Sequence, residues 1–433
     1  MRKDQIYVTG AGIISAIGNG KAETLASLLA GRTGIGEMKY LSSRHRDIPV
    51  GEVPLSNDEM RMLLGIEEDP LLTRTALMGR IALREALSQA RLTDEASCIN
   101  TDSVHFISAT TVGGMDRREL FHEQEENCDR THALIATHNC ASSTEMIAEE
   151  AKGFASLATI STACSSAANA IILGANMLRC GMADIVVAGG SECLSLFHLN
   201  GFNSLMILDH QWCRPFDRDR AGLNLGEGAA YLVIETEQSA KQRGVEPLCL
   251  LSGYGNACDA FHQTASSPDG KGAVLAMKEA LEMAHLQPND IHYINAHGTG
   301  TPNNDLSESQ AIKQVFGQTP PPVSSTKSFT GHTTSASGSI EAVICLLALQ
   351  HQFLPPNLNW HNPMDDGIIP ASPQFNSSFS AIATKRPLDI LKGGACVEYS
   401  EQESRAQQFN ITHILSNAFG FGGNDSSLIF SLP

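Results

Sequence analysis

The sequence lacks a long apolar segment. A membrane-spanning helix needs about 20 consecutive, mostly apolar residues, and every apolar run in this chain is interrupted before that length. The first residues, MRKDQIYVTGAG, also lack the continuous apolar stretch of a secretory signal peptide. We therefore expect neither a membrane anchor nor an export signal.

The cysteines form no pairing motif. There are 11 of them, scattered along the chain, and none belongs to a C-x-x-C pair. The odd number and irregular spacing argue against a disulfide framework and against a zinc ribbon. A protein of the reducing cytoplasm fits this pattern best.

Basic residues are scarce. The chain has 30 Lys and Arg against 47 Asp and Glu, a formal net charge of −17. Such a surface opposes general binding to nucleic acid or to anionic lipid. A local basic patch could still come from Arg61, Arg74, Arg80 and Arg84, although solvated helix faces explain these arginines equally well.

The predicted elements alternate between apolar strands and helices. Strands are expected at 5–10, 104–110, 183–192, 229–237, 248–257 and 291–298, and helices at 21–31, 71–90, 167–178, 272–284 and 339–352. This alternation favours a layered α/β fold. The pattern pauses at a polar stretch near residue 245 and then restarts, which predicts two similar halves, 1–245 and 246–433.

Two early glycines resemble part of a nucleotide-binding motif. Gly10 and Gly12 begin a G-x-G-x-x-G pattern, but Ser15 occupies its last position. The complete pattern and a downstream acidic residue would be needed for a dinucleotide site. We interpret the two glycines as a tight turn.

The segment STACSSA places Cys164 where a turn of small residues enters an almost wholly apolar helix. A thiol at a helix N-terminus lies at the positive end of the helix dipole, which favours the thiolate and lowers the thiol pKa. This predicts a nucleophile. A buried structural thiol explains the segment alone equally well.

A second segment, INAHGTGTPNND, places His297 directly after an apolar strand. Its glycines allow the backbone to approach a ligand, and Thr299 and Thr301 offer hydroxyl groups. Asp305 stands three residues before Glu308, a spacing typical of helix capping rather than catalysis.

A third segment, SSTKSFTGH, supplies Lys327 and His332 ahead of another apolar helix. A helix N-terminus disfavours a charged histidine, so His332 is expected to be neutral. A buried Lys327 needs a charge partner, and Glu341 on the following helix is the candidate. Near the C-terminus, SNAFGFGG sets Phe419 and Phe421 among glycines that could aim a backbone N–H into a site.

Together these motifs resemble the elongating type I/II class of β-ketoacyl-acyl carrier protein synthases, in the thiolase superfamily. The resemblance extends over nearly the whole chain and rests on TACSSA, RPFDRDRAGLNLGEGA, HGTGTPNND, KSFTGHTTSASGSIEA and FGFGG. It implies a duplicated thiolase-like α/β fold, with two mixed sheets in five layers, α-β-α-β-α. It also implies a homodimer that takes acyl and malonyl groups from the phosphopantetheine of acyl carrier protein and requires no other cofactor.

The resemblance assigns roles by motif position. Cys164 would accept the acyl chain as a thioester. His297 and His332 would promote decarboxylation of the malonyl group, with Lys327 and Glu341 supporting them. The backbone N–H groups of Cys164 and Phe421 would form the oxyanion hole. The expected substrate contacts are Thr299, Thr301, Phe419, Phe421 and Val112, and some relatives hold a monovalent cation at positions matching Asn295, Glu341, Ser416 and Asn417.

The chain departs from the family pattern after GFGG. Asn424 and Asp425 stand where the family commonly has Thr or His and then Asn, and AGLNLGEGA replaces the more usual DGFVMGEGA. Val112 falls at an acyl-pocket position, where a β-branched side chain suggests a restricted pocket. These departures concern substrate preference more than reaction type.

The resemblance favours condensation in type II fatty acid elongation. A ketosynthase of a dedicated polyketide or aryl polyene pathway shares the mechanism and stays open as the alternative. A non-catalytic chain-length partner subunit would lack the nucleophile that Cys164 supplies. His332 argues against an initiating synthase, and the segment around Cys396 matches a thiolase poorly.

Overall fold

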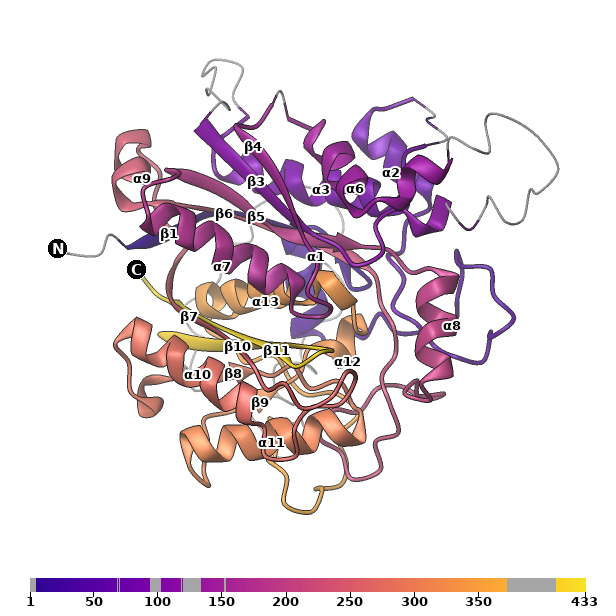
Figure 1. Cartoon of the computed structure of the whole chain (residues 1–433), viewed down its shortest axis with the longest axis vertical. Helices are drawn as coiled ribbons and strands as arrows, with labels where there is room; N and C mark the ends of the chain where they lie inside the picture. The colour runs from indigo at the N-terminus through magenta and orange to yellow at the C-terminus, as the bar shows by residue number, and fades with distance from the viewer. Residues whose placement is uncertain are drawn as a thin grey trace, which may run out of the picture.

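The computed structural model describes residues 5–67, 69, 71–93, 103–117, 119, 134–151, 153–371 and 410–433. The fold is α/β, with two mixed sheets between three layers of helices (Figure 1). Cys396 lies outside the described residues. The outer helices are α3 (Arg74–Gln89) and α6 (Cys140–Ala148) on one side and α10 (Lys271–Ala284) and α11 (Pro302–Phe316) on the other, with α7 (Ser166–Arg179) and α13 (Ser337–His351) between the sheets.

The two sheets have the same strand order. In the first, the order is β4 (Ser156–Ile160), β3 (Val104–Ala109), β5 (Ile185–Glu192), β6 (Gly228–Thr236) and β1 (Ile6–Ser15). In the second, read from its own outer edge, the corresponding order is β9 (Val323–Ser324), β8 (Tyr293–Asn295), β10 (His413–Gly420), β11 (Asn424–Ser431) and β7 (Cys249–Cys258). In both, the last strand in the chain lies antiparallel between the first and the fourth. A short contact of β1 with β7 joins the sheets, and β2 (Gly18–Asn19) extends β1. The boundary at residue 245 stays a prediction.

The glycines of β1 serve helix packing. The prediction of a tight turn is wrong, because Gly10 and Gly12 lie within the strand. A Cβ atom on Gly12 would lie 2.0 Å from the carbonyl oxygen of Ala82 in α3. In β7, a Cβ atom on Gly255 would lie 2.2 Å from the carbonyl oxygen of Ala276 in α10. Each half therefore uses glycine in its first strand to bring an outer helix onto the sheet.

The two central helices meet at their N-terminal ends. Apolar residues of α7 and α13 share one hydrophobic core with strands of both sheets. Gly338, in the first turn of α13, packs on α7 so closely that a Cβ atom there would lie 2.7 Å from the backbone nitrogen of Ala168. Residues just before the two helices are therefore brought together, and these include Cys164 and His332.

The remaining helices are short or peripheral. They are α1 (Lys21–Leu29), α2 (Asn57–Leu64), α8 (Leu196–Ser204), α9 (Glu237–Arg243) and α12 (Lys327–Thr330), with 3₁₀ turns η2 (Leu134–His138), η3 (Pro288–Asp290) and η4 (Thr334–Ala336). In the described ranges, no helix has both the length and the apolar character needed to cross a membrane.

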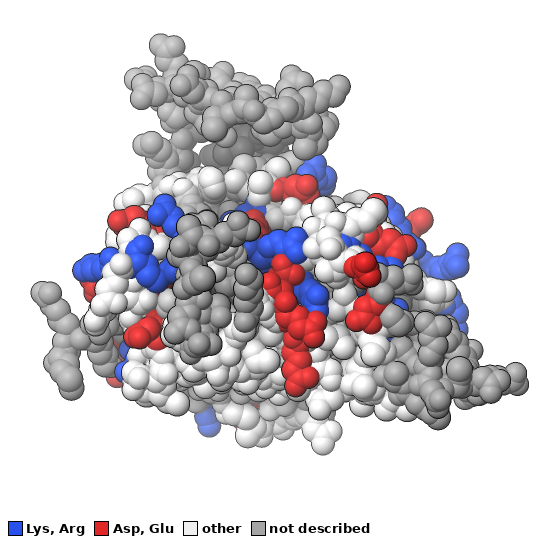
Figure 2. Space-filling model, turned by 90° about the horizontal axis from the view of Figure 1, so that it is seen from above, with Lys and Arg blue, Asp and Glu red and all other residues white. Residues whose placement is uncertain are grey.

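The four arginines considered as a basic patch are paired with carboxylates. Arg74 forms a buried ion pair with Glu227, and Arg80 is buried against Glu149. Arg61 and Arg84 pair with Asp58 and Glu150 respectively. On the face drawn in Figure 2, basic and acidic side chains lie next to one another. Arg74 and Arg80 are therefore structural, and the expectation that they contribute to a local basic patch is wrong.

Candidate active site

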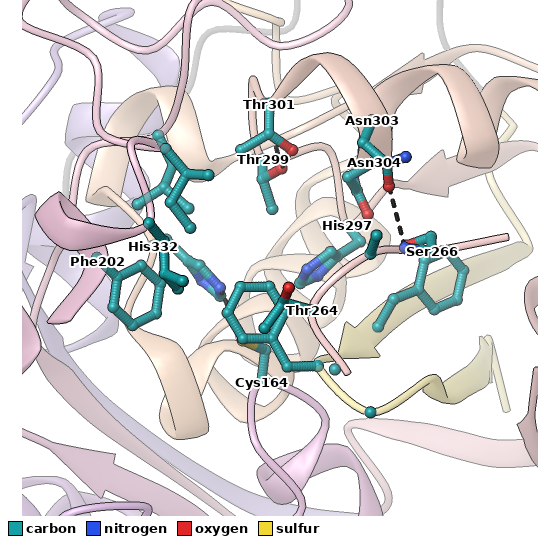
Figure 3. A pocket seen from close by; sticks show the side chains of 18 of the residues that line it. Cys164, Phe202, Thr264, Ser266, His297, Thr299, Thr301, Asn303, Asn304 and His332 are labelled. Carbon is teal, nitrogen blue, oxygen red and sulfur yellow. Dashed lines mark hydrogen bonds between the residues drawn. The ribbon is translucent and has the colours of Figure 1, made fainter. Parts of the chain in front are cut away.

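A cavity of about 250 Å³ lies next to the N-terminal ends of the two central helices. Cys164, His297 and His332 line it together (Figure 3). Cys164 comes from the turn before α7, His297 from the loop after β8, and His332 from the loop between α12 and η4. Both halves of the chain thus contribute to one site.

Cys164 lies on a strained elbow between β4 and α7. The preceding residue, Ala163, has a φ of +54°, which is uncommon for a residue other than glycine. The hydroxyl oxygen of Ser166 accepts a hydrogen bond from the backbone N–H of Thr162 at 2.8 Å and holds the turn closed. This geometry aims the Cys164 side chain at the cavity, where its sulfur lies 3.0 Å from Nε2 of His332.

Burial dominates the protonation of Cys164. Only 5% of the residue is exposed, and burial raises the pKa of its thiol to about 11. The charge of Lys327 and the backbone N–H groups of Phe421 and Cys164 act in the opposite direction. The expectation of a lowered thiol pKa is therefore wrong. The same two N–H groups lie within hydrogen-bonding reach of the sulfur, and their role as an oxyanion hole stays a prediction.

The two histidines form a neutral pair. Their rings lie edge to face, with centroids 5.3 Å apart. Burial lowers the pKa of both rings well below the usual value, and the positive charge of Lys327 lowers both further. Nδ1 of His332 lies 3.0 Å from the Ser337 hydroxyl, so Nε2 is directed toward Cys164. Neutral imidazoles can accept a proton or donate a hydrogen bond.

Lys327 and Glu341 form a buried ion pair beneath the histidines. Nζ of Lys327 donates to Oε1 of Glu341 and lies 3.3 Å from Nδ1 of His297. Both side chains are almost completely buried. The charge partner proposed from the sequence is therefore the one that the structure pairs with Lys327.

The residues considered for a monovalent cation lie near this pair. Oε2 of Glu341 is buried and has no hydrogen-bond partner among the described residues, so it fits a role as a cation ligand. Asn295 donates weakly to the Ser416 hydroxyl at 3.4 Å, whereas the Asn417 amide oxygen accepts from Ser427. The cation site stays a prediction.

Two buried carboxylates hold the His297 loop. Glu308 accepts hydrogen bonds from the backbone N–H groups of His297 at 2.8 Å and Gly298 at 2.7 Å. The sequence predicted that Asp305 caps its own helix, but its carboxylate instead accepts hydrogen bonds from the backbone N–H groups of Gly300 and Phe216. Sequence reasoning missed both roles, since the i, i+3 spacing of two acidic residues near a helix start also fits a local cap.

The lining of the cavity includes both hydroxyl groups and aromatic rings. Thr299 and Thr301 line it, with hydroxyl oxygens 2.8 Å apart. Phe419 lies beside His297, their ring centroids 5.7 Å apart. Phe421 stacks on Phe202 of α8 at 5.9 Å, a partner that the sequence did not reveal.

Val112 is buried outside the lining of this cavity. Its backbone N–H lies 3.4 Å from the carboxylate of Glu192. Among the described residues, the structure therefore does not bring Val112 to the cavity that holds Cys164.

Known proteins resemble the chain along its full length. The family models described as "Beta-ketoacyl synthase, N-terminal domain" and "Beta-ketoacyl synthase, C-terminal domain" match residues 3–240 and 248–361. The 3-oxoacyl-acyl-carrier-protein synthase 2 of Synechocystis sp. is 32% identical, over 99% of this chain and 98% of that protein.

Two solved structures resemble it in fold and in sequence. The ishigamide ketosynthase/chain length factor has a TM-score of 0.86 and 28% identity, and the match covers 100% of both chains. A ketosynthase in complex with its chain length factor from Xenorhabdus doucetiae has a TM-score of 0.78 and 27% identity, covering 99% of this chain and 98% of that one.

Proposed function

Because the chain belongs to the β-ketoacyl synthase family, we propose that it condenses an acyl thioester on Cys164 with a malonyl group carried by acyl carrier protein. The reaction belongs to type II fatty acid elongation. One observation carries the proposal: the Cys164 sulfur lies 3.0 Å from Nε2 of His332, in the cavity that also holds His297.

Acyl transfer begins at the thiol. Cys164 is protonated at neutral pH, so Nε2 of His332 accepts its proton as the sulfur attacks the acyl carbonyl. The N–H groups of Cys164 and Phe421 stabilise the negative charge on the carbonyl oxygen. The carrier thiol leaves with the proton from His332, and the acyl group stays on Cys164.

Condensation then uses the histidine pair. Nε2 of His297, whose Nδ1 faces Lys327, donates a hydrogen bond to the thioester carbonyl of the malonyl group. His332 donates a second one after its proton moves from Nδ1 to Nε2, and Nδ1 then accepts from the Ser337 hydroxyl. Carbon dioxide leaves, and the electron pair of the broken bond forms an enolate. Its carbon attacks the acyl-Cys164 carbonyl, so a carbon–carbon bond forms and the thiolate of Cys164 departs. A proton from solvent then restores the thiol. The phosphopantetheine arm that presents both substrates would pass Thr299 and Thr301.

A reconstituted reaction tests the proposal. The chain is mixed with acyl- and malonyl-loaded carrier protein, beside Cys164→Ala and Cys164→Gln. The wild type should form the β-ketoacyl product and both variants should not, whereas Cys164→Gln keeps malonyl decarboxylation because both histidines survive. Equal condensation by Cys164→Ala would refute the assignment.

A dedicated polyketide or polyene pathway is the second candidate. The two solved structures described above, both ketosynthases associated with a chain length factor, favour it. Acyl carrier proteins loaded with defined acyl chains separate the two functions. A polyene or polyketide enzyme should prefer unsaturated or β-oxo acyl chains over saturated ones.

We also propose that the chain pairs with a second thiolase-like chain through β4. Among the described residues this strand ends the first sheet, and Leu157 on it is 43% exposed. An unpaired apolar edge strand is a natural site for sheet extension across an interface. Light scattering of the isolated chain, alone and with a chain length factor, distinguishes a homodimer from a heterodimer. Cytoplasmic location stays a prediction.

A further inference from the structure

A polar network connects the elbow of Cys164 to the turn that carries Phe421. Its centre is the amide oxygen of Asn424, at the start of β11. This oxygen accepts hydrogen bonds from Nδ2 of Asn169 at 2.7 Å, from the Ser165 hydroxyl at 2.8 Å and from Nδ2 of Asn256 at 3.0 Å. Three elements of the two halves, α7, β7 and β11, therefore meet at one atom.

On the side of Cys164, the network reaches the residues that precede and follow Ala163 and Cys164. Asn169 donates to the Thr162 hydroxyl at 2.8 Å. The Ser165 hydroxyl oxygen lies 2.7 Å from the Thr162 carbonyl oxygen, so this carbonyl and the Asn424 amide oxygen share the single Ser165 proton. Thr162 and Ser165 flank Ala163 and Cys164 on either side. The backbone N–H of Cys164 is thus held by residues that Asn424 holds.

On the side of the β10–β11 turn, Phe421 lies between Gly420 and Asn424 in the chain. Asn424 pairs with Gly420 across the β10–β11 turn. Gly420 packs on the elbow, where a Cβ atom would lie 2.8 Å from the Thr162 carbonyl oxygen and 3.0 Å from the Ser165 hydroxyl. Displacing Asn424 would therefore move the Phe421 N–H relative to the Cys164 N–H.

We propose that Asn424 is a positioning residue for acyl transfer, because its amide oxygen sets the spacing between the two N–H groups that face the cysteine sulfur. The inference rests on the proposed function. Asn424 touches none of the reacting atoms and acts through the elbow and the turn. The histidine pair is anchored elsewhere, by Glu308 and Ser337, so decarboxylation should not depend on Asn424.

The test separates these two half-reactions. Acyl transfer is measured in a single turnover, as the carrier thiol released when Cys164 is acylated. Malonyl decarboxylation is measured in the Cys164→Gln background. Asn424→Ala should slow acyl transfer about 10-fold to 100-fold, since loss of one oxyanion donor costs about 100-fold or more and a displaced donor costs less. Decarboxylation should stay within about twofold.

Matched variants control for structural damage. Asn424→Asp keeps an oxygen that can accept from the same donors and should restore most of the acyl-transfer rate. Ser431→Ala removes hydrogen bonds at the opposite end of β11 and should leave both rates unchanged. If Asn424→Ala does not fold, Asn169→Ala breaks the same link from α7 and decides the question.

The outcomes are distinct. Unchanged acyl transfer in Asn424→Ala or Asn169→Ala would overturn the proposal, and so would an equal fall in both half-reactions. If the wild-type chain itself transfers no acyl group, the proposed function fails instead.

Discussion

The alkylation rate of Cys164 is expected to rise about tenfold per pH unit between pH 7 and 9. Burial raises the pKa of its thiol to about 11, so only about one molecule in 10⁴ carries the thiolate at pH 7. The dipole of α7 opposes this, but a helix terminus contributes at most about 2 kcal/mol, or roughly 1.5 pKa units. Even with that full contribution the thiol pKa stays above 9, so burial wins.

The assay is the second-order rate of iodoacetamide modification from pH 6 to 10, followed at the peptide that contains Cys164. The exposed Cys180 serves as an internal reference for the reagent, and Cys164→Ser confirms the assignment of the peptide. A Cys164 rate that is already constant between pH 6 and 8 would refute the reasoning. That result would mean that Cys164 and His332 exist as a thiolate–imidazolium pair before substrate binds.

Three further predictions follow from buried charges. Arg74→Met strands the buried carboxylate of Glu227 and should lower the free energy of unfolding by about 3–5 kcal/mol in urea titrations; a loss under about 1 kcal/mol would instead indicate a solvated arginine. Lys327→Met removes a charge that lowers the pKa of both histidines, so the acidic limb of the decarboxylation profile should move to higher pH, and an unmoved limb contradicts this. Burial and neighbouring carboxylates raise the pKa of Asp425 from 3.8 to about 8. Between these two pH values the unfolded chain has lost the Asp425 proton and the folded chain still binds it, so the free energy of unfolding falls by about 1.4 kcal/mol per pH unit. Asp425→Asn should be more stable than the wild type at pH 8 and equal to it near pH 4, as denaturation at both pH values will check; equal stabilities at pH 8 would contradict the raised pKa.

Residues whose environment is local could be predicted from the sequence. Cys164 and His332 each precede an apolar helix, and His297 follows an apolar strand, so their positions at element ends were visible as patterns. Glu341 could be predicted as the partner of Lys327, because a buried ammonium needs a carboxylate and Glu341 belongs to the next predicted helix. The roles that the resemblance assigns to these residues still await the experiments above.

Residues whose environment is made by distant elements could not be predicted. Gly10 and Gly12 lie within β1, where α3 packs closely on them, and no local pattern reveals that contact. The side of a helix that carries Arg74 was visible, but its pairing with a carboxylate 153 positions away was not. The thiol pKa was misjudged for the same reason, because the dipole is a local property whereas burial depends on both halves.

The ion pair of Lys327 and Glu341 is better explained by protonation states than by stability. A buried pair often contributes little or nothing to stability compared with apolar residues, because both charges lose their hydration. Here the pair places the Lys327 ammonium 3.3 Å from His297, and its charge lowers the pKa of both histidines that line the cavity. Glu341 pairs with Lys327 beneath the histidines, and neither of these two side chains lines the cavity. An apolar replacement of both residues is therefore expected to preserve the fold and to raise the pKa of both imidazoles, on whose neutral form the proposed decarboxylation depends.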